Sequence, residues 1–467
     1  MDFVGRKDEL DLLKQDVQAP GMRSVLLYGR RRVGKSELIR QALKSAKGRK
    51  LVFVAAQTLF PNNLAALSAV LANAYGLPLS FSNLPDLLAF VGQASAKEKT
   101  IFVIDEYSYF REEDGLVDSA FQRFIDTSRS NSQLTLILSG SIVRIMKGLI
   151  EGNAPLYGRF DTIIALAPFS YLEAAEFYPE RPPEEKFFLY ATLGGIPHYL
   201  VDLNPGESAE QNLIRLLFKK NAALKNEAET LLNDELSSIE NANAVLSLLG
   251  NRSLHYSEIN QLFPSSRGNG ATYILNKLLA MGLIDKSLAI NAKEERNLSY
   301  RISDPFLRFY YAYYASTRSL ALLYEPEDLY ATFIKKDLES AFLPKAFEEV
   351  AGEFLIEKNK RKELSPRLLA LGNYAYSYKD DATKKWINGE FDLVSQDERG
   401  YSDYECKYRS HALTLEDIAK EQASVAKSKV PFYRIGFFSR KGYAVGLHSS
   451  DELPLYTLDD LYALPVK

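Results

Sequence analysis

The chain has 467 residues, of which 46% are hydrophobic, and its 57 basic and 60 acidic side chains give a net charge of −3. At about 100–200 residues per domain, this length predicts two to four domains with ample material for buried cores. The near-balance of charge excludes a global basic field that would attract nucleic acid, so any such contact is expected to be local. The single cysteine, Cys406, excludes an intramolecular disulfide and fits a reducing compartment.

Membrane insertion and secretion are not expected. No apolar run approaches the ~20 residues that a membrane helix needs, and residues 1–7 lack the basic-then-apolar pattern of a signal peptide. The sequence therefore predicts a soluble cytoplasmic protein without membrane contact.

Residues 1–168 show the pattern of an α/β domain. Five short apolar runs are rich in Val, Ile, Leu or Phe and are bounded by turn or charged residues, as strands buried on both faces are. Helical stretches lie between these runs, which is the alternation that produces a parallel sheet. The predicted strands are residues 25–28, 51–55, 101–104, 134–139 and 162–166.

A complete P-loop pattern follows the first predicted strand and opens a helix predicted over residues 37–46. Its glycines let backbone N–H groups wrap phosphates, and the helix N-terminus adds partial positive charge. Lys35 is expected to reach the β- and γ-phosphates of ATP, and Ser36 to ligate Mg²⁺. The residues expected to contact the nucleotide here are Gly29, Arg30, Arg31, Arg32, Val33, Gly34, Lys35, Ser36 and Glu37.

The second half of this site is predicted where the third strand ends. Four apolar residues, 101–104, precede Asp105 and Glu106. Asp105 is expected to hold the magnesium shell, and Glu106 to polarise the attacking water. The alternative is a buried strand that ends in a solvated acidic turn, but the neighbouring P-loop favours a nucleotide site.

These motifs resemble those of archaeal-type P-loop ATPases of the AAA+/STAND group, and the resemblance covers most of residues 1–340. Residues 3–10, with Gly5 and Arg6, are similar to the N-terminal segment that packs near the adenine in that group. Residues 138–141 resemble its sensor strand, which implies that Ser141 watches the γ-phosphate. Plain polar residues at a strand end are the alternative.

Two further residues are assigned by the same resemblance. Arg159 ends a segment, 156–159, similar to one that carries a conserved arginine in that group; it is otherwise a surface arginine, or it acts on a neighbouring subunit. Pro197 lies in a Gly-x-Pro element that reports nucleotide state from the lid; it is otherwise part of a helix terminator.

Two predicted segments follow: a helical lid over residues 169–236, and a winged helix with a helical connector over 237–339. The winged helix is predicted from a short helix at 258–263 capped by Ser257, a turn at 264–268, and a helix with an apolar stripe from Ala271 to Leu279. Strands at 283–290 and 298–302 would complete it. The residues that could meet a DNA major groove are Arg267, Asn269, Thr272, Tyr273, Asn276 and Lys277.

The segment is only modestly basic, whereas DNA-binding faces usually carry several lysines or arginines. A winged helix used for packing or for a protein partner is therefore an equal alternative.

Residues 340–467 contain a candidate catalytic and metal site. Asp392 and Glu405 lie symmetrically about a turn expected at 398–399, so they are expected to face each other across a hairpin. Glu405 and Lys407 are two positions apart and share a strand face. Two carboxylates can hold Mg²⁺ or Mn²⁺, and the lysine can orient or activate a water.

This arrangement resembles the PD-(D/E)xK nuclease fold, which implies an α/β, restriction-endonuclease-like domain and a further acid on a preceding helix. Glu348, in a helix expected from about 345 to 358, is the candidate acid, and Gln422 is a candidate accessory residue. The region also resembles an uncharacterised domain that often follows archaeal-type ATPase modules. It lacks the usual proline before Asp392, and a surface hairpin with ordinary charge alternation is the alternative.

Together these features predict an ATP-binding and hydrolysing switch that controls a DNA-binding winged helix and a nuclease-like C-terminal domain. ATP or ADP and double-stranded DNA are the expected partners, with a homo-oligomer also considered. One alternative is a regulatory ATPase whose C-terminal domain is an inactive scaffold for DNA or protein. Another is a partner-recognition module of a defence or toxin system.

Overall fold

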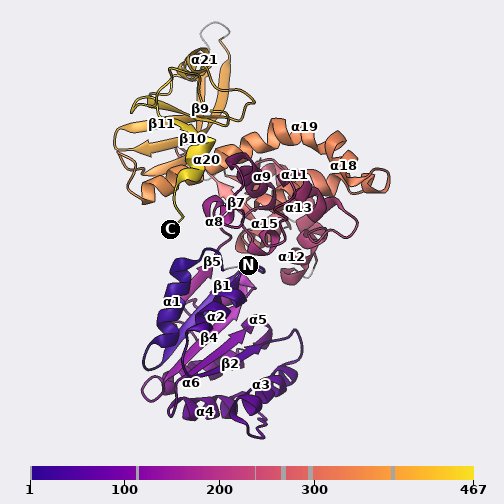
Figure 1. Cartoon of the computed structure of the whole chain (residues 1–467), viewed down its shortest axis with the longest axis vertical. Coiled ribbons are helices and arrows are strands. Elements are labelled where there is room, and N and C mark those ends of the chain that lie inside the picture. The colour runs from indigo at the N-terminus through magenta and orange to yellow at the C-terminus, as the bar shows by residue number, and fades with distance from the viewer. Residues whose placement is uncertain are drawn as a thin grey trace. The chain divides into compact units, whose positions relative to one another are not determined.

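The computed structural model describes residues 3–111, 115–236, 238–263, 270–292, 298–379 and 384–466 (Figure 1). The chain forms two compact units. The first comprises the residues up to Pro168 together with Ile196–Val201, and the second comprises Phe169–Gly195 and Asp202–Val466. In the described ranges, no helix combines the length and the apolar character that crossing a membrane requires.

A five-stranded parallel sheet lies at the centre of the first unit, in the order β2-β3-β4-β1-β5. All five predicted strands are confirmed. Every residue of β3 and β4 is buried, as uninterrupted apolar runs predict. In the edge strands β2 and β5 exposed and buried residues alternate, so the expectation of burial on both faces was wrong for these two. The strands are β1 (Arg23–Gly29), β2 (Arg49–Val54), β3 (Thr100–Asp105), β4 (Leu134–Gly140) and β5 (Thr162–Leu166).

Helices flank this sheet. Leucine and phenylalanine side chains of α3, α4 and α6 pack against β3 and β4 in one continuous apolar cluster. The helices of this unit are α1 (Lys7–Gln18), α2 (Lys35–Lys44), α3 (Phe60–Tyr75), α4 (Leu84–Ser95), α5 (Tyr107–Phe110), α6 (Leu116–Ser128), α7 (Val143–Gly148) and α10 (Pro197–Leu200). Because the strands are parallel, the carboxyl ends of β1, β3 and β4 meet at one edge of the sheet, where α/β proteins bind ligands.

The second unit begins with short helices. They are α8 (Tyr171–Ala175), α9 (Pro183–Leu193), α11 (Ala209–Leu213) with the π-helical turn η1 (Ile214–Phe218), and α12 (Glu227–Glu235). A later helical stretch comprises α16 (Pro305–Phe309), η3 (Tyr310–Tyr314), α17 (Ala315–Thr317), η4 (Leu320–Leu322), α18 (Pro326–Leu329), η5 (Tyr330–Ile334), α19 (Lys335–Asp337), η6 (Leu338–Phe342) and α20 (Leu343–Lys360).

Between these helical stretches lie α13 (Glu240–Leu249), α14 (Tyr256–Asn260), α15 (Gly270–Ala280) and a three-stranded antiparallel sheet, β6-β8-β7. Its strands are β6 (Leu254–His255), β7 (Ile284–Ser287) and β8 (Ser299–Ile302). The prediction that Ser257 caps a helix over 258–263 was wrong. His255 is the N-cap, because its main-chain N–H donates to the Glu258 carboxylate at 2.8 Å. The predicted turn at 264–268 and its neighbour Asn269 lie outside the described residues.

The chain ends in a five-stranded mixed sheet, β13-β12-β11-β10-β9. Its elements are β9 (Ala370–Lys379), β10 (Trp386–Asp397), β11 (Gly400–Lys407), α21 (Leu415–Lys427), β12 (Phe432–Ser439), β13 (Leu455–Thr457) and α22 (Leu458–Ala463). The pairs Asp397↔Gly400 and Val394↔Asp403 confirm the predicted turn centre at 398–399. Between Phe391 and Val394 the pairing of β10 with β9 shifts register.

Candidate functional site

The P-loop joins β1 to α2 and encloses the Lys35 side chain, which is 5% exposed. Lys35 Nζ donates to the main-chain oxygens of Gly29, at 2.9 Å, and Arg30, at 3.1 Å. The loop turns through left-handed backbone at Arg32 (φ 67°) and Gly34 (φ 98°), a conformation that glycine adopts without a side-chain clash. The ammonium group is thus held at the N-terminus of α2, where a phosphate is favoured.

Charges at the end of β3 act on Lys35. Burial lowers the pKa of the Lys35 ammonium, while the carboxylates of Glu106 and Asp105 favour its charged form. The Ser36 hydroxyl donates to Oδ2 of Asp105 at 2.6 Å. A hydroxyl and a carboxylate beside a phosphate-binding lysine are the donor set that holds Mg²⁺ in P-loop proteins, so these two residues fit a divalent cation.

Glu106 adopts left-handed backbone (φ 55°) directly after β3. Its Oε2 accepts hydrogen bonds from the main-chain N–H of Ser141, at 3.1 Å, and from the Ser141 hydroxyl, at 2.6 Å. At the preceding position, Gly140, a Cβ would lie 2.5 Å from Sδ of Met146, so the end of β4 packs too closely on that side chain for a larger residue. A non-glycine residue in this backbone region at a strand end is often functional, and here it directs the carboxylate to the predicted sensor residue.

Pro197 also lies beside the P-loop. A Cβ placed on Gly34 would be 3.9 Å from Cγ of Pro197. The segment Ile196–Val201 clusters with the first unit although the chain on both sides of it belongs to the second. Pro197 therefore lies beside the P-loop, and its role as a reporter of nucleotide state remains a prediction.

Gly5, Arg6 and Glu37 are the other residues predicted to contact the nucleotide. Gly5 and Arg6 adopt left-handed backbone, and the Arg6 guanidinium donates to the main-chain oxygen of Ala167. The Glu37 carboxylate accepts from Arg40, which is the main reason its pKa is lowered, and from Gln41. The contacts of these residues with adenine or phosphate remain predictions.

Arg159 lies at the other edge of the sheet. Its main-chain oxygen accepts a hydrogen bond from Ser24 at the start of β1, and its guanidinium pairs with Asp126 on α6 at 3.1 Å. Ser24 and Gly29 are five residues apart on β1, roughly 16 Å at ~3.3 Å per residue. Arg159 therefore does not contact the P-loop of its own chain, and the two stated alternatives, a surface arginine or action on a neighbouring subunit, both remain.

The predicted C-terminal site is partly assembled. Lys407 Nζ lies 2.7 Å from Oε2 of Glu405 and 3.2 Å from Oε1 of Glu421. Burial and the Asp392 carboxylate raise the pKa of Glu348 to about 8. Burial and the nearby carboxylates of Glu390 and Glu405 raise the pKa of Asp392. The predicted acids thus share one electrostatic environment.

The metal site itself is not seen. The observed pairs of β10 and β11 stop at Val394↔Asp403, two residues short of Asp392 and Glu405. In the part of the chain that the structure describes, no three or more His, Cys, Asp and Glu side chains group so as to hold a metal ion. Metal binding by Asp392 and Glu405 remains a prediction.

Two acidic residues of this cluster were missed from the sequence. Glu421 on α21, and not its neighbour Gln422, bonds Lys407, and it also pairs with Arg409 at 3.2 Å. Asp417 and Glu421 are four positions apart, so they lie on one helix face, and Arg409 pairs with both. This spacing is the sequence signal that could have pointed to Glu421. Asp403 is 2% exposed, and burial with the nearby Glu405 raises its pKa to about 8.

Comparison with known proteins identifies the N-terminal part. Residues 3–203 match a family described as an ATPase domain predominantly from Archaea. This part of the chain is a P-loop ATPase domain. Residues 310–422 match a family of archaeal and bacterial proteins of unknown function.

One relative matches well beyond the ATPase domain. An uncharacterised protein of Methanocaldococcus jannaschii is 27% identical over 402 residues, 84% of each chain. An uncharacterised ATP-binding protein of the same organism is 44% identical over 45 residues, 10% of this chain and 76% of the relative. Among solved structures, a Walker-type ATPase of Pyrococcus abyssi has 18% identity and a TM-score of 0.47, covering 66% of this chain and 96% of its own. The Aeropyrum pernix ORC2 protein has 15% identity and a TM-score of 0.42, covering 68% and 96%.

Proposed function

We propose that the chain is an ATP-hydrolysing switch of the AAA+/STAND type. The observation that carries this proposal is the Ser141–Glu106 pair beside the Ser36–Asp105 pair. Lys35 would neutralise β- and γ-phosphate charge, and Ser36 and Asp105 would hold Mg²⁺, which supplies further positive charge to the phosphates. Glu106 would accept the proton of the attacking water.

Ser141 gives this switch a way to sense its ligand. Its hydroxyl now donates to Glu106 and can be redirected to a γ-phosphate oxygen, which would free the carboxylate for the water. Pro197, against Gly34, would carry the change in the loop to the segment that connects α9 to Asp202 in the second unit. The test is ATP turnover by the purified chain in Mg²⁺ buffer. An Asp105→Asn variant should lose turnover, and turnover equal to wild type would refute this assignment of the site.

The proposed output of the switch is the second unit, with residues 237–339 as a winged helix and residues 340–466 as a nuclease-like domain. The order α14, α15, β7, β8 and the small antiparallel sheet support the winged helix. The shared electrostatics of Glu348, Asp392 and Glu405, with Lys407 bonded to Glu405, support a metal-dependent phosphodiesterase site. Assembly of that site would need Mg²⁺ or Mn²⁺ to balance the carboxylates.

A cleavage assay on single- and double-stranded DNA, with and without Mn²⁺ and ATP, tests this output. Asp392→Asn should abolish cleavage and leave ATP turnover unchanged. The matched control is Asp451→Asn, an exposed aspartate in the same unit. Cleavage that survives in Asp392→Asn would come from another site or a contaminant and would refute the role of Asp392.

One observation favours the regulatory alternative, in which the C-terminal domain is an inactive scaffold. Lys407 is held between two carboxylates, Glu405 and Glu421, and so does not point freely at a substrate. If no DNA or RNA is cleaved in Mn²⁺ while ATP turnover is intact, this alternative replaces the nuclease proposal.

A further inference from the structure

Three aromatic rings from distant parts of the sequence meet beside the candidate nuclease site of the second unit. The ring centroid of Phe187, on α9, lies 5.7 Å from that of Phe347 on α20 and 5.2 Å from that of Tyr408, which follows β11. The centroids of Phe347 and Tyr408 are 5.7 Å apart, so each ring contacts the other two. Tilted and edge-to-face pairs at such separations attract each other, so this ring cluster holds α9, α20 and the end of β11 together.

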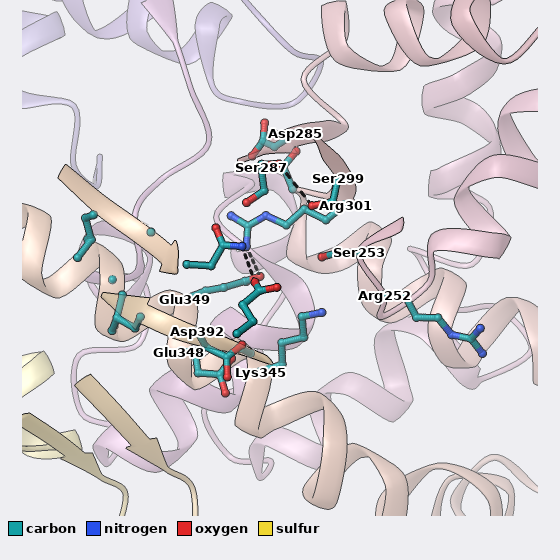
Figure 2. A pocket seen from close by; sticks show the side chains of 18 of the residues that line it. Arg252, Ser253, Asp285, Ser287, Ser299, Arg301, Lys345, Glu348, Glu349 and Asp392 are labelled. Carbon is teal, nitrogen blue, oxygen red and sulfur yellow. Dashed lines mark hydrogen bonds and ion pairs between the residues drawn. The ribbon is translucent and has the colours of Figure 1, made fainter. Parts of the chain in front are cut away.

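Two members of the ring cluster are sequence neighbours of candidate catalytic residues. Phe347 precedes Glu348, and Figure 2 shows Glu348 and Asp392 side by side in the lining of one cavity. Tyr408 directly follows Lys407. Because residues that are neighbours on a helix or a strand move together, the separation of these two rings sets the separation of Glu348 and Lys407.

One stripe of α9 contacts both of the elements that carry these candidates. Glu184 pairs with Arg440 at 3.2 Å, and the Arg440 guanidinium lies 4.5 Å from the ring centroid of Tyr408. Two turns further along α9, the Tyr190 hydroxyl donates to Glu353 of α20 at 2.9 Å. Positions 184, 187 and 190 are spaced three apart and so lie along one side of the helix. A shift of α9 would therefore act on α20 and on the end of β11 at the same time.

The chain also connects α9 to the P-loop region. The helix ends at Leu193, and residues 194–196 lead from it to Pro197. Pro197 lies beside Gly34 of the P-loop, at 3.9 Å from the position of a Cβ on that glycine. If Pro197 shifts with the bound nucleotide, as its predicted role implies, the short connection would transmit that shift to α9.

We propose that Phe187 is a positioning residue of the C-terminal site, and that α9 makes its position depend on the nucleotide. The inference rests on the proposed nuclease-like function and adds the regulation of that site. Close-packed interiors leave little space into which a ring can yield. The Phe187 ring therefore fixes how closely Glu348 and Lys407 approach each other, and a movement of α9 changes that approach.

Cys406 is a natural reporter of this arrangement. It is the only cysteine of the chain, it precedes Lys407, and its thiol is partly buried. Side chains alternate along a strand, so Cys406 shares a face of β11 with Tyr404. The Tyr404 ring centroid lies 6.0 Å from that of Phe438, which lies 5.9 Å from that of Phe354 on α20. The thiol is therefore on the face that α20 covers, and its labelling rate should rise when α20 loosens from β11.

The first test measures the rate at which N-ethylmaleimide labels Cys406, followed by mass spectrometry. Phe187→Leu should raise this rate at least about threefold, because the loss of one ring pair corresponds to a change of about two- to tenfold. Phe188→Leu makes the same change at a neighbouring buried position of α9 outside the ring cluster and should leave the rate near that of wild type.

The second test adds a non-hydrolysable ATP analogue with Mg²⁺. In wild type and in Phe188→Leu, the analogue should change the labelling rate by at least about fivefold, the lower end of the usual coupling between two sites. Phe187→Leu should lose this response. Glu184→Gln, which weakens the ion pairs with Arg440 and Lys441 without altering the core, should reduce it. Glu180→Gln, at an exposed position near the start of α9, is the matched control.

Three outcomes would overturn the proposal. They are a wild-type labelling rate that does not respond to the analogue, a full response in Phe187→Leu, and equal effects of Phe187→Leu and Phe188→Leu, which would reduce the ring cluster to ordinary core packing. Circular dichroism melting shows whether each variant is folded. If Phe187→Leu is unfolded, Glu184→Gln decides, and a full response in that variant would overturn the coupling through α9.

DNA cleavage in Mn²⁺ is the measurement that depends on the nuclease function. Phe187→Leu should lower kcat and leave KM within about twofold, as expected when the geometry of the reacting groups changes and substrate binding does not. ATP turnover should be unaffected. Cleavage by Phe187→Leu at the wild-type kcat would overturn the positioning role. If wild type cleaves no DNA although Cys406 responds to the analogue, the nuclease function is refuted and the nucleotide-dependent position of α9 stands.

Discussion

The Ser141 hydroxyl donates a hydrogen bond of 2.6 Å to Oε2 of Glu106, so the predicted sensor residue and the predicted general base are bonded to each other. The Ser141 main-chain N–H adds a second bond to the same oxygen, at 3.1 Å. In this arrangement the carboxylate lone pairs on Oε2 are occupied. Donation from Ser141 lowers the basicity of this carboxylate toward water, and a γ-phosphate oxygen is another partner that ATP would offer to Ser141.

Glu106→Gln should bind ATP near normally and hydrolyse it about 10²–10⁴-fold more slowly, which is the usual contribution of a general base. Ser141→Ala should lower turnover by about fivefold, the equivalent of one hydrogen bond worth about 1 kcal/mol. Single-turnover hydrolysis measures both variants. Glu151→Gln, on the exposed surface of the same unit, should behave as wild type. An unchanged rate in Glu106→Gln would assign the base to another residue.

Lys35→Ala should weaken Mg²⁺–ATP binding by about 10- to 100-fold, because hydrogen bonds to charged groups contribute about 1.5–3 kcal/mol. The ammonium is buried and needs only to leave the oxygens of Gly29 and Arg30 to reach a phosphate. Calorimetric titration measures the affinity, and Lys47→Ala, an exposed lysine in the loop after α2, is the control. Equal affinities for Lys35→Ala and wild type would contradict the P-loop assignment.

Arg159→Ala should leave turnover within about twofold of wild type at low protein concentration. Its ion pair with Asp126 is at the edge of the sheet away from the P-loop, and an exposed pair contributes about 0–1 kcal/mol to stability. Turnover measured over a range of protein concentrations separates the remaining possibilities. A defect that grows with concentration would show that Arg159 acts on a neighbouring copy, whereas a defect at every concentration would contradict its observed position.

The ATPase part of the site could be predicted from the sequence because its determinants are local. Buried parallel strands appear in the sequence as uninterrupted apolar runs, and the P-loop residues are consecutive. The position of the P-loop therefore shows where the first strand ends, and the strand in turn supports the P-loop assignment. Arg159 was placed by resemblance alone, and nothing in its spacing reveals that its guanidinium pairs with Asp126. The cap at His255 was missed because Ser257 is the commoner capping residue type.

The contacts that organise the second unit could not be predicted in the same way. Asn291 and Ala375 are 84 positions apart. Their hydrogen bonds depend on the position of the edge strand β9 in the folded unit, and the periodicity of the sequence does not predict that position. The hairpin register was recoverable because a two-residue turn fixes it. No comparable turn in the sequence marks the register shift in β10 between Phe391 and Val394. This shift falls at Asp392, which was expected to pair with Glu405.

Glu353 provides a prediction about pH and stability that does not depend on any ligand. Its Oε1 accepts from the Tyr190 hydroxyl at 2.9 Å and its Oε2 from the Tyr171 N–H at 3.4 Å. Burial raises its pKa from 4.5 to about 7, although both bonds favour the ionised form. Between these two values the unfolded chain releases the proton while the folded protein retains it. The free energy of unfolding should therefore fall as the pH rises from 4.5 to 7 and be insensitive to this group outside that range.

Glu353→Gln keeps an oxygen that can accept from Tyr190 and removes the ionisation. The difference between 4.5 and about 7 corresponds to at most about 3 kcal/mol at 1.36 kcal/mol per pH unit. The variant should match wild type at pH 4.5 and exceed it by up to that amount at pH 8. Urea unfolding of the second unit followed by circular dichroism at both pH values measures this, with Glu452→Gln as an exposed control. A variant less stable than wild type at pH 8 would mean that the ionised carboxylate stabilises the fold through Tyr190 and Tyr171, and that burial is not the dominant effect.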